Sequence, residues 1–210
     1  MSNIWIILQG FGLGLSMIVP IGAQNAYVLN QGIKRQHHLT TATICSLCDI
    51  VFITLGIFGG GALLSSNATL LNTVTLGGIL FLSFYGAMSV KAVLQNRYEK
   101  AEIDKSTSRG RRAVILGALA VTLLNPHVYL DTIVVLGSIG GQFSEDGRIA
   151  FATGTLLASL SWFYGVSLAA AKMAPVLSKP RVQRTIDAVI AGFMFFIAWK
   201  LASGLLGRLG

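Results

Sequence analysis

The chain has 210 residues, of which 53% are hydrophobic and only 11% are charged, and its formal net charge is +8. In a soluble globular domain about a quarter of the residues are charged. This composition, together with a mean hydropathy of +0.69, therefore excludes an ordinary soluble domain and indicates a membrane protein.

Six segments are long and apolar enough to cross a membrane, which takes about 20 mostly apolar residues per helix. They are residues 4–29, 40–64, 70–93, 113–139, 149–171 and 186–206. No remaining stretch could bury a separate soluble core. The sequence thus predicts an all-α polytopic membrane protein with a single transmembrane domain over residues 1–210. A five-span version, with one short or re-entrant segment, stays open.

Two of these segments are interrupted in the same way. Pro20 is followed five residues later by Asn25, and Pro126 is followed five residues later by Asp131. Proline removes a backbone donor and clashes with the preceding turn, so a membrane helix that contains it tends to break. Paired breaks at matching positions of two halves point to a substrate site near the membrane midplane.

The two interrupted segments each open one half of the chain. Residues 1–94 and 113–210 each supply three segments and are joined by the polar linker 95–112. With an odd number of spans per half, the second half enters the membrane from the opposite side. We therefore expect six transmembrane helices in a 3+3 inverted repeat, with a broken first helix in each half. The alternative is that the two prolines match by chance.

The basic residues are distributed unevenly among the connections between the segments. The first connection holds two, the third seven and the fifth four, so 13 of the 16 Lys and Arg residues lie in odd-numbered connections. The positive-inside rule makes these connections, including the linker 95–112, cytoplasmic and predicts periplasmic termini. Lys200 and Arg208, near the outer end of the last segment, count against this orientation. The positive charge fits a lipid bilayer surface and not nucleic acid.

Two acidic residues, Asp49 and Asp131, lie deep in apolar segments, whereas the other six lie in linkers or at a helix start. Placing Asp at the centre of a membrane helix costs about 2.5 to 3.5 kcal/mol, and such residues usually mark a transport pathway or a proton relay. The alternative is structural: each carboxyl group could bond Ser, Thr or Tyr side chains across a helix interface.

Other polar residues carry weaker signals. Cys45 and Cys48 are expected to be small buried residues, because structural zinc needs four ligands; we expect no metal and no cofactor. His127 either relays protons or is a hydrogen-bonded residue of the second broken segment. The glycine-rich stretches favour close helix packing and would permit a homodimer. A nucleotide-binding loop would need a βαβ context that this sequence lacks.

The residues around both breaks resemble the two signatures of the LysE/ArgO family of basic amino acid exporters. Residues 21–35 are similar to the first signature and residues 124–131 to the second, while 157–163 and 177–182 also fit the family pattern. The resemblance covers nearly the whole chain, and the short linker 95–112 is similar to that of the arginine branch. It implies an exporter of L-arginine, with lysine and arginine analogues as further substrates, in a bacterial inner membrane. It also implies that the membrane gradient drives export in place of ATP.

The resemblance and the residue chemistry point to the same site. A guanidinium group pairs bidentately with carboxylates, so Asp49 and Asp131 suit the side chain of arginine. Gln24, Asn25 and Asn125 could supply orienting amide contacts. The backbone donors of a half-helix N-terminus beyond a break suit the substrate carboxylate. Exchange of one arginine for one proton would be electroneutral, so we expect proton antiport.

Two alternatives come from other classes of protein. An intramembrane aspartyl protease also uses two aspartates, but Cys48 and Leu130 stand where the Gly-x-Gly-Asp signature needs glycine. A non-transporting membrane assembly subunit would explain the glycine spacing but would leave two costly acids unused. We therefore do not expect an enzyme.

Overall fold

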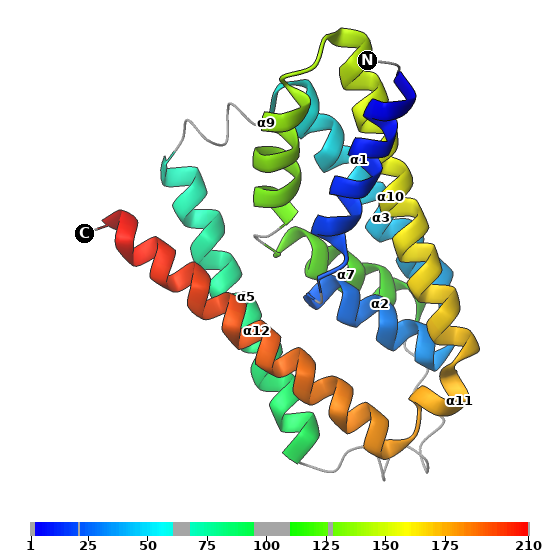
Figure 1. The fold of residues 1–210 in the computed structure, drawn as a ribbon. Helices are drawn as coiled ribbons and strands as arrows, with labels where there is room; N and C mark the ends of the chain where they lie inside the picture. The colour runs from blue at the N-terminus through cyan, green and yellow to red at the C-terminus, as the bar shows by residue number, and fades with distance from the viewer. Residues whose placement is uncertain (1–2, 21, 61–67, 95–109, 126–127, 210) are drawn as a thin grey trace.

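The computed structural model of the chain describes residues 3–20, 22–60, 68–94, 110–125 and 128–209 (Figure 1). Within these ranges the chain forms helices joined by turns, and no strand occurs. The all-α class predicted from the sequence is therefore confirmed. Pro126 and His127 lie outside the described residues.

The first half of the chain begins with two helices separated by a sharp bend. α1 (Asn3–Ile18) and α2 (Ala23–Lys34) meet at 83°. α3 (His38–Leu55) then continues into the π-helical turn η1 (Gly56–Gly60), and α5 (Ala68–Leu94) follows. The bend contains Pro20, as expected from the loss of a backbone donor at that position. The first segment is thus a broken helix, as the sequence predicted.

The second half also contains a helix break near its start. A short helix, α7 (Arg111–Leu123), precedes a break, which is followed by the π-helical segment η2 (Tyr129–Leu136) and α9 (Gly137–Gly140). The remaining helices are α10 (Glu145–Lys172), the single turn α11 (Ala174–Leu177) and α12 (Pro180–Leu209). α10 has two acids in its first turn and Lys172 in its last, which suits the helix dipole.

Four helical stretches of the described chain are long and apolar enough to cross a membrane: His38–Gly59, Thr75–Leu94, Glu145–Lys172 and Pro180–Leu206. The bent pair formed by α1 and α2 would make a fifth span. The apolar helix after the second break, Asp131–Gly140, is shorter. The multi-pass architecture is therefore established, while six spans arranged as 3+3 stay a prediction.

Small residues allow the helices of the main body to touch. α1 lies along α10, and a Cβ added at Gly10 would overlap the carbonyl oxygen of Phe151, while one added at Gly154 would overlap that of Ile7. Where η1 meets α9, a Cβ at Gly137 would lie 2.6 Å from the carbonyl oxygen of Gly56. Close backbone approach of this kind is typical of membrane helix packing.

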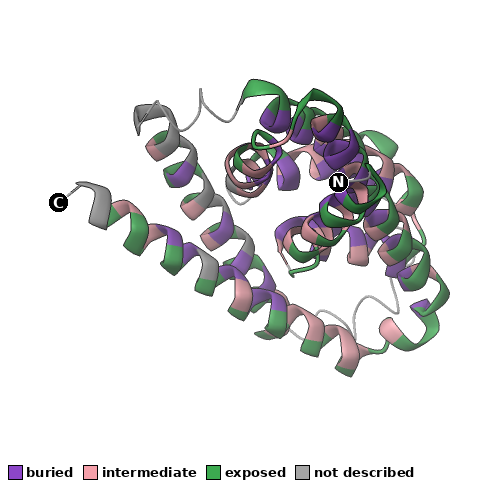
Figure 2. Ribbon diagram, turned by 45° about the horizontal axis from the view of Figure 1, so that its top comes forward, coloured by how far each residue is buried: buried purple, intermediate pink, exposed green. Residues whose placement is uncertain are grey.

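α5 and α12 form an antiparallel pair beside this main body (Figure 1). Many of their large apolar side chains are exposed, including Phe84 and Trp199, each at 65%. Buried residues line the inner faces of the helices, while exposed ones cover the outside (Figure 2). An apolar outer surface of this extent is stable when lipid covers it. The inner face of α12 contributes Met194 and Ala198 to the same hydrophobic cluster as Ala26 of α2.

Candidate functional site

The first helix break is held by the side chain of Asn25. Its Nδ2 atom donates hydrogen bonds to the carbonyl oxygens of Ile18, at 2.6 Å, and Pro20, at 2.9 Å. Carbonyl groups at the end of a helix lack intrahelical partners, and in a membrane water does not replace them. The Oδ1 atom of Asn25 in turn accepts a hydrogen bond from Nε1 of Trp162 in α10, at 3.0 Å. The amide of Asn25 is thus engaged within the protein on both sides.

The second break is supported by an aromatic side chain. The hydroxyl group of Tyr129 donates a hydrogen bond to the carbonyl oxygen of Leu123, the last residue of α7, at 2.7 Å. Asn125, which lies between them in the chain, is buried, and its backbone carbonyl oxygen accepts a hydrogen bond from the backbone N–H of Val128. Tyr129 therefore donates a hydrogen bond to the C-terminal end of α7, just as Asn25 does to the C-terminal end of α1.

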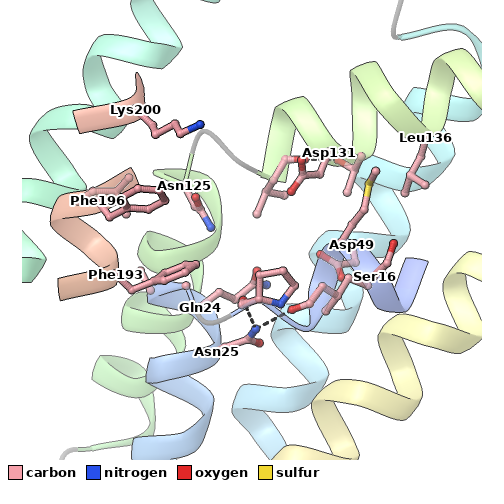
Figure 3. A pocket seen from close by; sticks show the side chains of 18 residues that line it. Ser16, Gln24, Asn25, Asp49, Asn125, Asp131, Leu136, Phe193, Phe196 and Lys200 are labelled. Carbon is pink, nitrogen blue, oxygen red and sulfur yellow. Dashed lines mark hydrogen bonds between the residues drawn. The ribbon is translucent and has the colours of Figure 1, made fainter. Parts of the chain in front are cut away.

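Both breaks border one cavity of about 440 Å³. Its lining contains all of the predicted site residues that the structure describes, and Figure 3 labels the polar ones among them. They are Pro20, Gln24, Asn25, Asp49, Asn125 and Asp131. These residues come from α2, α3, η2 and the two breaks, and so from both halves of the chain. The cavity volume is in the range of small-molecule sites, which span roughly 300 to 1,000 Å³.

The two acids enter the cavity from different helices. Asp49, in α3, is only 3% exposed, and its Oδ2 atom accepts a hydrogen bond from Oγ of Ser159 in α10, at 2.6 Å. Asp131, in η2, is half-buried. The bond from Ser159 is of the kind expected if Asp49 has a structural role, in which the acid bonds a hydroxyl group across a helix interface. Asp49 also lines the cavity, so the bond to Ser159 is compatible with a role in binding.

The start of α2 also opens onto the cavity through Gly22 and Ala23. No side chain caps this helix N-terminus within the described structure. The first backbone N–H groups of a helix lack intrahelical partners and suit an anionic group. The cavity thus combines two carboxyl groups with a helix N-terminus.

Several residues at the site or beside it have no role that the sequence alone would predict. Ser159 and Trp162 lie in α10 and contact Asp49 and Asn25, respectively. Phe196 and Lys200 line the cavity from α12. Lys200 was visible in the sequence as a cation inside an apolar segment, but only the structure shows which face of α12 it occupies. No group of three or more His, Cys, Asp or Glu side chains gathers within the described residues.

Residues 15–204 match the family model described as LysE type translocator. An arginine exporter protein ArgO from Yersinia enterocolitica is 50% identical over 197 residues, which are 94% of this chain and 96% of that protein. ArgO from Photorhabdus laumondii is 52% identical over 200 residues, covering 95% and 96% of the two chains. ArgO from Pectobacterium carotovorum is 50% identical over 199 residues, covering 94% and 96%. No solved structure matches the chain significantly.

Proposed function

We propose that this chain, which belongs to the LysE type translocator family, exports L-arginine across the bacterial inner membrane. Relatives named as arginine exporters match it along almost its whole length, so the chain is a transporter of amino acids and not an enzyme. The observation that supports the choice of substrate is the cavity, which brings Asp49 and Asp131 together from different helices. Lysine and arginine analogues are further candidate substrates.

In this proposal the two carboxyl groups bind the cationic side chain of the substrate. A planar guanidinium group offers five N–H donors in a fixed fork, and carboxylate oxygens match that geometry. Asp49 is held by Ser159, so its position is fixed before the substrate arrives. Gln24 and Asn125 line the cavity beside the two acids and would orient the substrate through their amide groups. Asn25, which is engaged within the protein, would instead maintain the break.

We propose that export is coupled to protons. Moving one positive charge out of a cell with a negative interior costs about 2.3 kcal/mol per 100 mV. If one of the cavity acids releases arginine outside and carries a proton inward, each cycle moves no net charge. Asp49 and Asp131 are the candidate carriers, because they are the carboxyl groups that line the cavity.

We further propose that residues 1–94 and 113–210 form an inverted repeat, with the linker 95–112 in the cytoplasm and both termini in the periplasm. Each half begins with a short helix and a break, and two long helices follow: α3 and α5 in the first half, α10 and α12 in the second. The uneven distribution of Lys and Arg supports the orientation. In this arrangement the cavity lies where the two breaks meet, as in transporters with discontinuous helices.

Radiolabelled arginine efflux from proteoliposomes tests the proposal. Vesicles that contain the purified protein and are loaded with arginine should release it faster than protein-free vesicles, and an acidic exterior should accelerate release. An efflux rate that does not depend on the proton gradient would contradict proton antiport but would still support arginine export. A purified, folded protein that releases no arginine would favour the alternative of a non-transporting assembly subunit.

A further inference from the structure

A lysine side chain lies in the wall of the cavity that faces the two acids. Lys200 lines the cavity from α12, whereas Asp49 and Asp131 line it from α3 and η2 (Figure 3). Among the described residues that line the cavity, Lys200 is the one Lys or Arg. The cavity is therefore bipolar, with acidic groups at one side and an ammonium group at the other.

The direction of the Lys200 side chain points to a role inside the cavity. Its Nζ atom lies 6.0 Å from the ring centroid of Phe196, one turn earlier in α12. Phe196 also lines the cavity. The side chain thus folds back along its helix over the cavity wall, and the amine projects into the space beside Asn125 (Figure 3). A lysine whose ammonium group snorkels to the membrane surface would extend toward the C-terminal end of α12.

Lys200 is exposed and lies in the outer part of α12. The cost of about 2.5 to 3.5 kcal/mol for a charged residue applies at the centre of a membrane helix and is smaller near its end, where a long side chain can reach the interface, so the position of Lys200 alone does not mark it as functional. α12 is one of the apolar helices long enough to cross a membrane, and Lys200 lies nine residues before its end at Leu209.

We propose that Lys200 binds the α-carboxylate of the substrate while Asp49 and Asp131 bind its cationic side chain. This inference rests on the proposed export of arginine. A cationic amino acid is itself bipolar, with a carboxylate at one end and a guanidinium or ammonium group at the other. Cavity and substrate charges then match end to end. The preferred substrates are then cationic amino acids with a free carboxylate, and the corresponding decarboxylated amines bind more weakly.

The N-terminus of α2 is a competing partner for the carboxylate, since its backbone donors open onto the same cavity. A second competing role for Lys200 is that of an internal cation, which occupies the acids when the substrate is absent. The two roles predict different effects of removing the lysine. Loss of a carboxylate partner weakens arginine binding, whereas loss of an internal competitor strengthens the binding of every cation.

The test compares arginine with agmatine, which has the same guanidinium group but no carboxylate. The purified full-length protein is assayed for binding of radiolabelled arginine, with unlabelled arginine and unlabelled agmatine as competitors. We expect the native protein to bind arginine about tenfold or more tightly than agmatine, the effect of one charge-assisted hydrogen bond. Lys200→Gln should weaken arginine binding by a similar factor and leave agmatine binding almost unchanged.

Two further variants sharpen the comparison. Lys200→Arg keeps the charge and should keep the preference for arginine. Lys91→Gln removes a lysine from the exposed face of α5, away from the cavity, and should behave as the native protein. An unchanged arginine-to-agmatine ratio in Lys200→Gln would overturn the inference and assign the carboxylate to α2. Tighter binding of both compounds would overturn it in favour of an internal cation. No saturable arginine binding by the native protein would overturn the proposed function together with this inference.

Discussion

The hydroxyl group of Ser159 donates a 2.6 Å hydrogen bond to Oδ2 of Asp49 and thereby links α10 to α3. Both side chains are buried, at 1% and 3% exposure. Hydrogen bonds to a carboxylate are shorter and stronger than those between neutral groups, so this bond limits the orientations open to Asp49. Asp49 is therefore both a contact between two long helices and part of the cavity wall. Mutation can separate these two roles.

Ser159→Ala should weaken the positioning of Asp49 while leaving its carboxyl group in place. A hydrogen bond to a charged group contributes about 1.5 to 3 kcal/mol, so we expect the KM for arginine efflux to rise by about tenfold. Initial rates from proteoliposomes at graded internal arginine concentrations give this value. Ser161→Ala, on the exposed face of the same helix, is the matched control. A native KM in Ser159→Ala would show that the bond serves packing alone.

Asp49→Asn and Asp131→Asn should each nearly abolish arginine efflux at normal levels of inserted protein. Asn keeps the size and one acceptor oxygen of Asp but removes its negative charge and its titratable proton. Glu at either position restores the charge with one additional methylene and should recover part of the activity. Asp146→Asn, in the exposed first turn of α10, is the control for loss of a carboxyl group elsewhere. Native efflux from both cavity variants would remove these acids from the mechanism.

The long helices and the first break could be predicted from the sequence because their causes are local. Hydropathy over about 20 residues marks a span, and α3, α5, α10 and α12 follow the apolar segments closely. Pro20 marks the first break for a similar reason, since it removes a backbone donor at its own position. The 83° bend between α1 and α2 was not predictable. Asn25 bonds both Ile18 and Pro20 at this break, and Trp162, from a distant part of the chain, bonds Asn25 in turn.

The site could be predicted only in part, because acidic residues stand out in an apolar segment of the sequence whereas their hydrogen-bond partners do not. Asp49 is unusual in an apolar segment, so sequence alone selects it. Ser159 is an ordinary residue for a membrane helix, and it lies 110 positions from Asp49 in the chain. Only the packing of α10 against α3 makes it a partner of that acid. The sequence shows Lys200 as a charge in an apolar segment, but its place in the cavity depends on how α12 is rotated about its axis.

The close backbone contact at one glycine of α1 predicts that two neighbouring Gly→Ala substitutions differ in their effect on the melting temperature. Gly10→Ala would place a Cβ against the backbone of Phe151, whereas nothing lies within 4 Å of a Cβ at Gly12. We expect Gly10→Ala to lower the melting temperature of the purified protein and Gly12→Ala to leave it unchanged. Gly56→Leu and Gly137→Leu should likewise impair folding, since these two residues touch where η1 meets α9. Well-folded, active Leu variants would contradict this account of the packing.

The orientation in the membrane can be tested with single cysteines. In a background without Cys45 and Cys48, a cysteine introduced at Ser106 should resist an impermeant thiol reagent in intact cells and react in inverted vesicles. A cysteine introduced at Ser66 should show the reverse pattern. The expectation follows from the 13 of 16 Lys and Arg residues in odd-numbered connections. Labelling of Ser106→Cys from outside intact cells would reverse the proposed orientation.

The last prediction concerns Asn25, which joins the first break to α10 through Trp162. Asn25→Ala would leave the carbonyl oxygens of Ile18 and Pro20 without their side-chain donor. Unsatisfied backbone groups within a membrane cost several kcal/mol each, so both the melting temperature and the transport rate should fall. Trp162→Phe removes the bond to Asn25 and some packing but leaves both bonds that Asn25 donates, so it should have a smaller effect. Trp5→Phe, on an exposed part of α1, should have none.

Asn25→Asp separates hydrogen bonding from packing at the same position. Asp has nearly the volume of Asn, but an ionised carboxylate cannot donate and would repel the two carbonyl oxygens. If the donated bonds hold the break, Asn25→Asp should be at least as damaging as Asn25→Ala. If the side chain only fills space, Asn25→Asp should resemble the native protein in melting temperature. Thermal unfolding of the purified variants, followed by arginine efflux from those that fold, decides between the two.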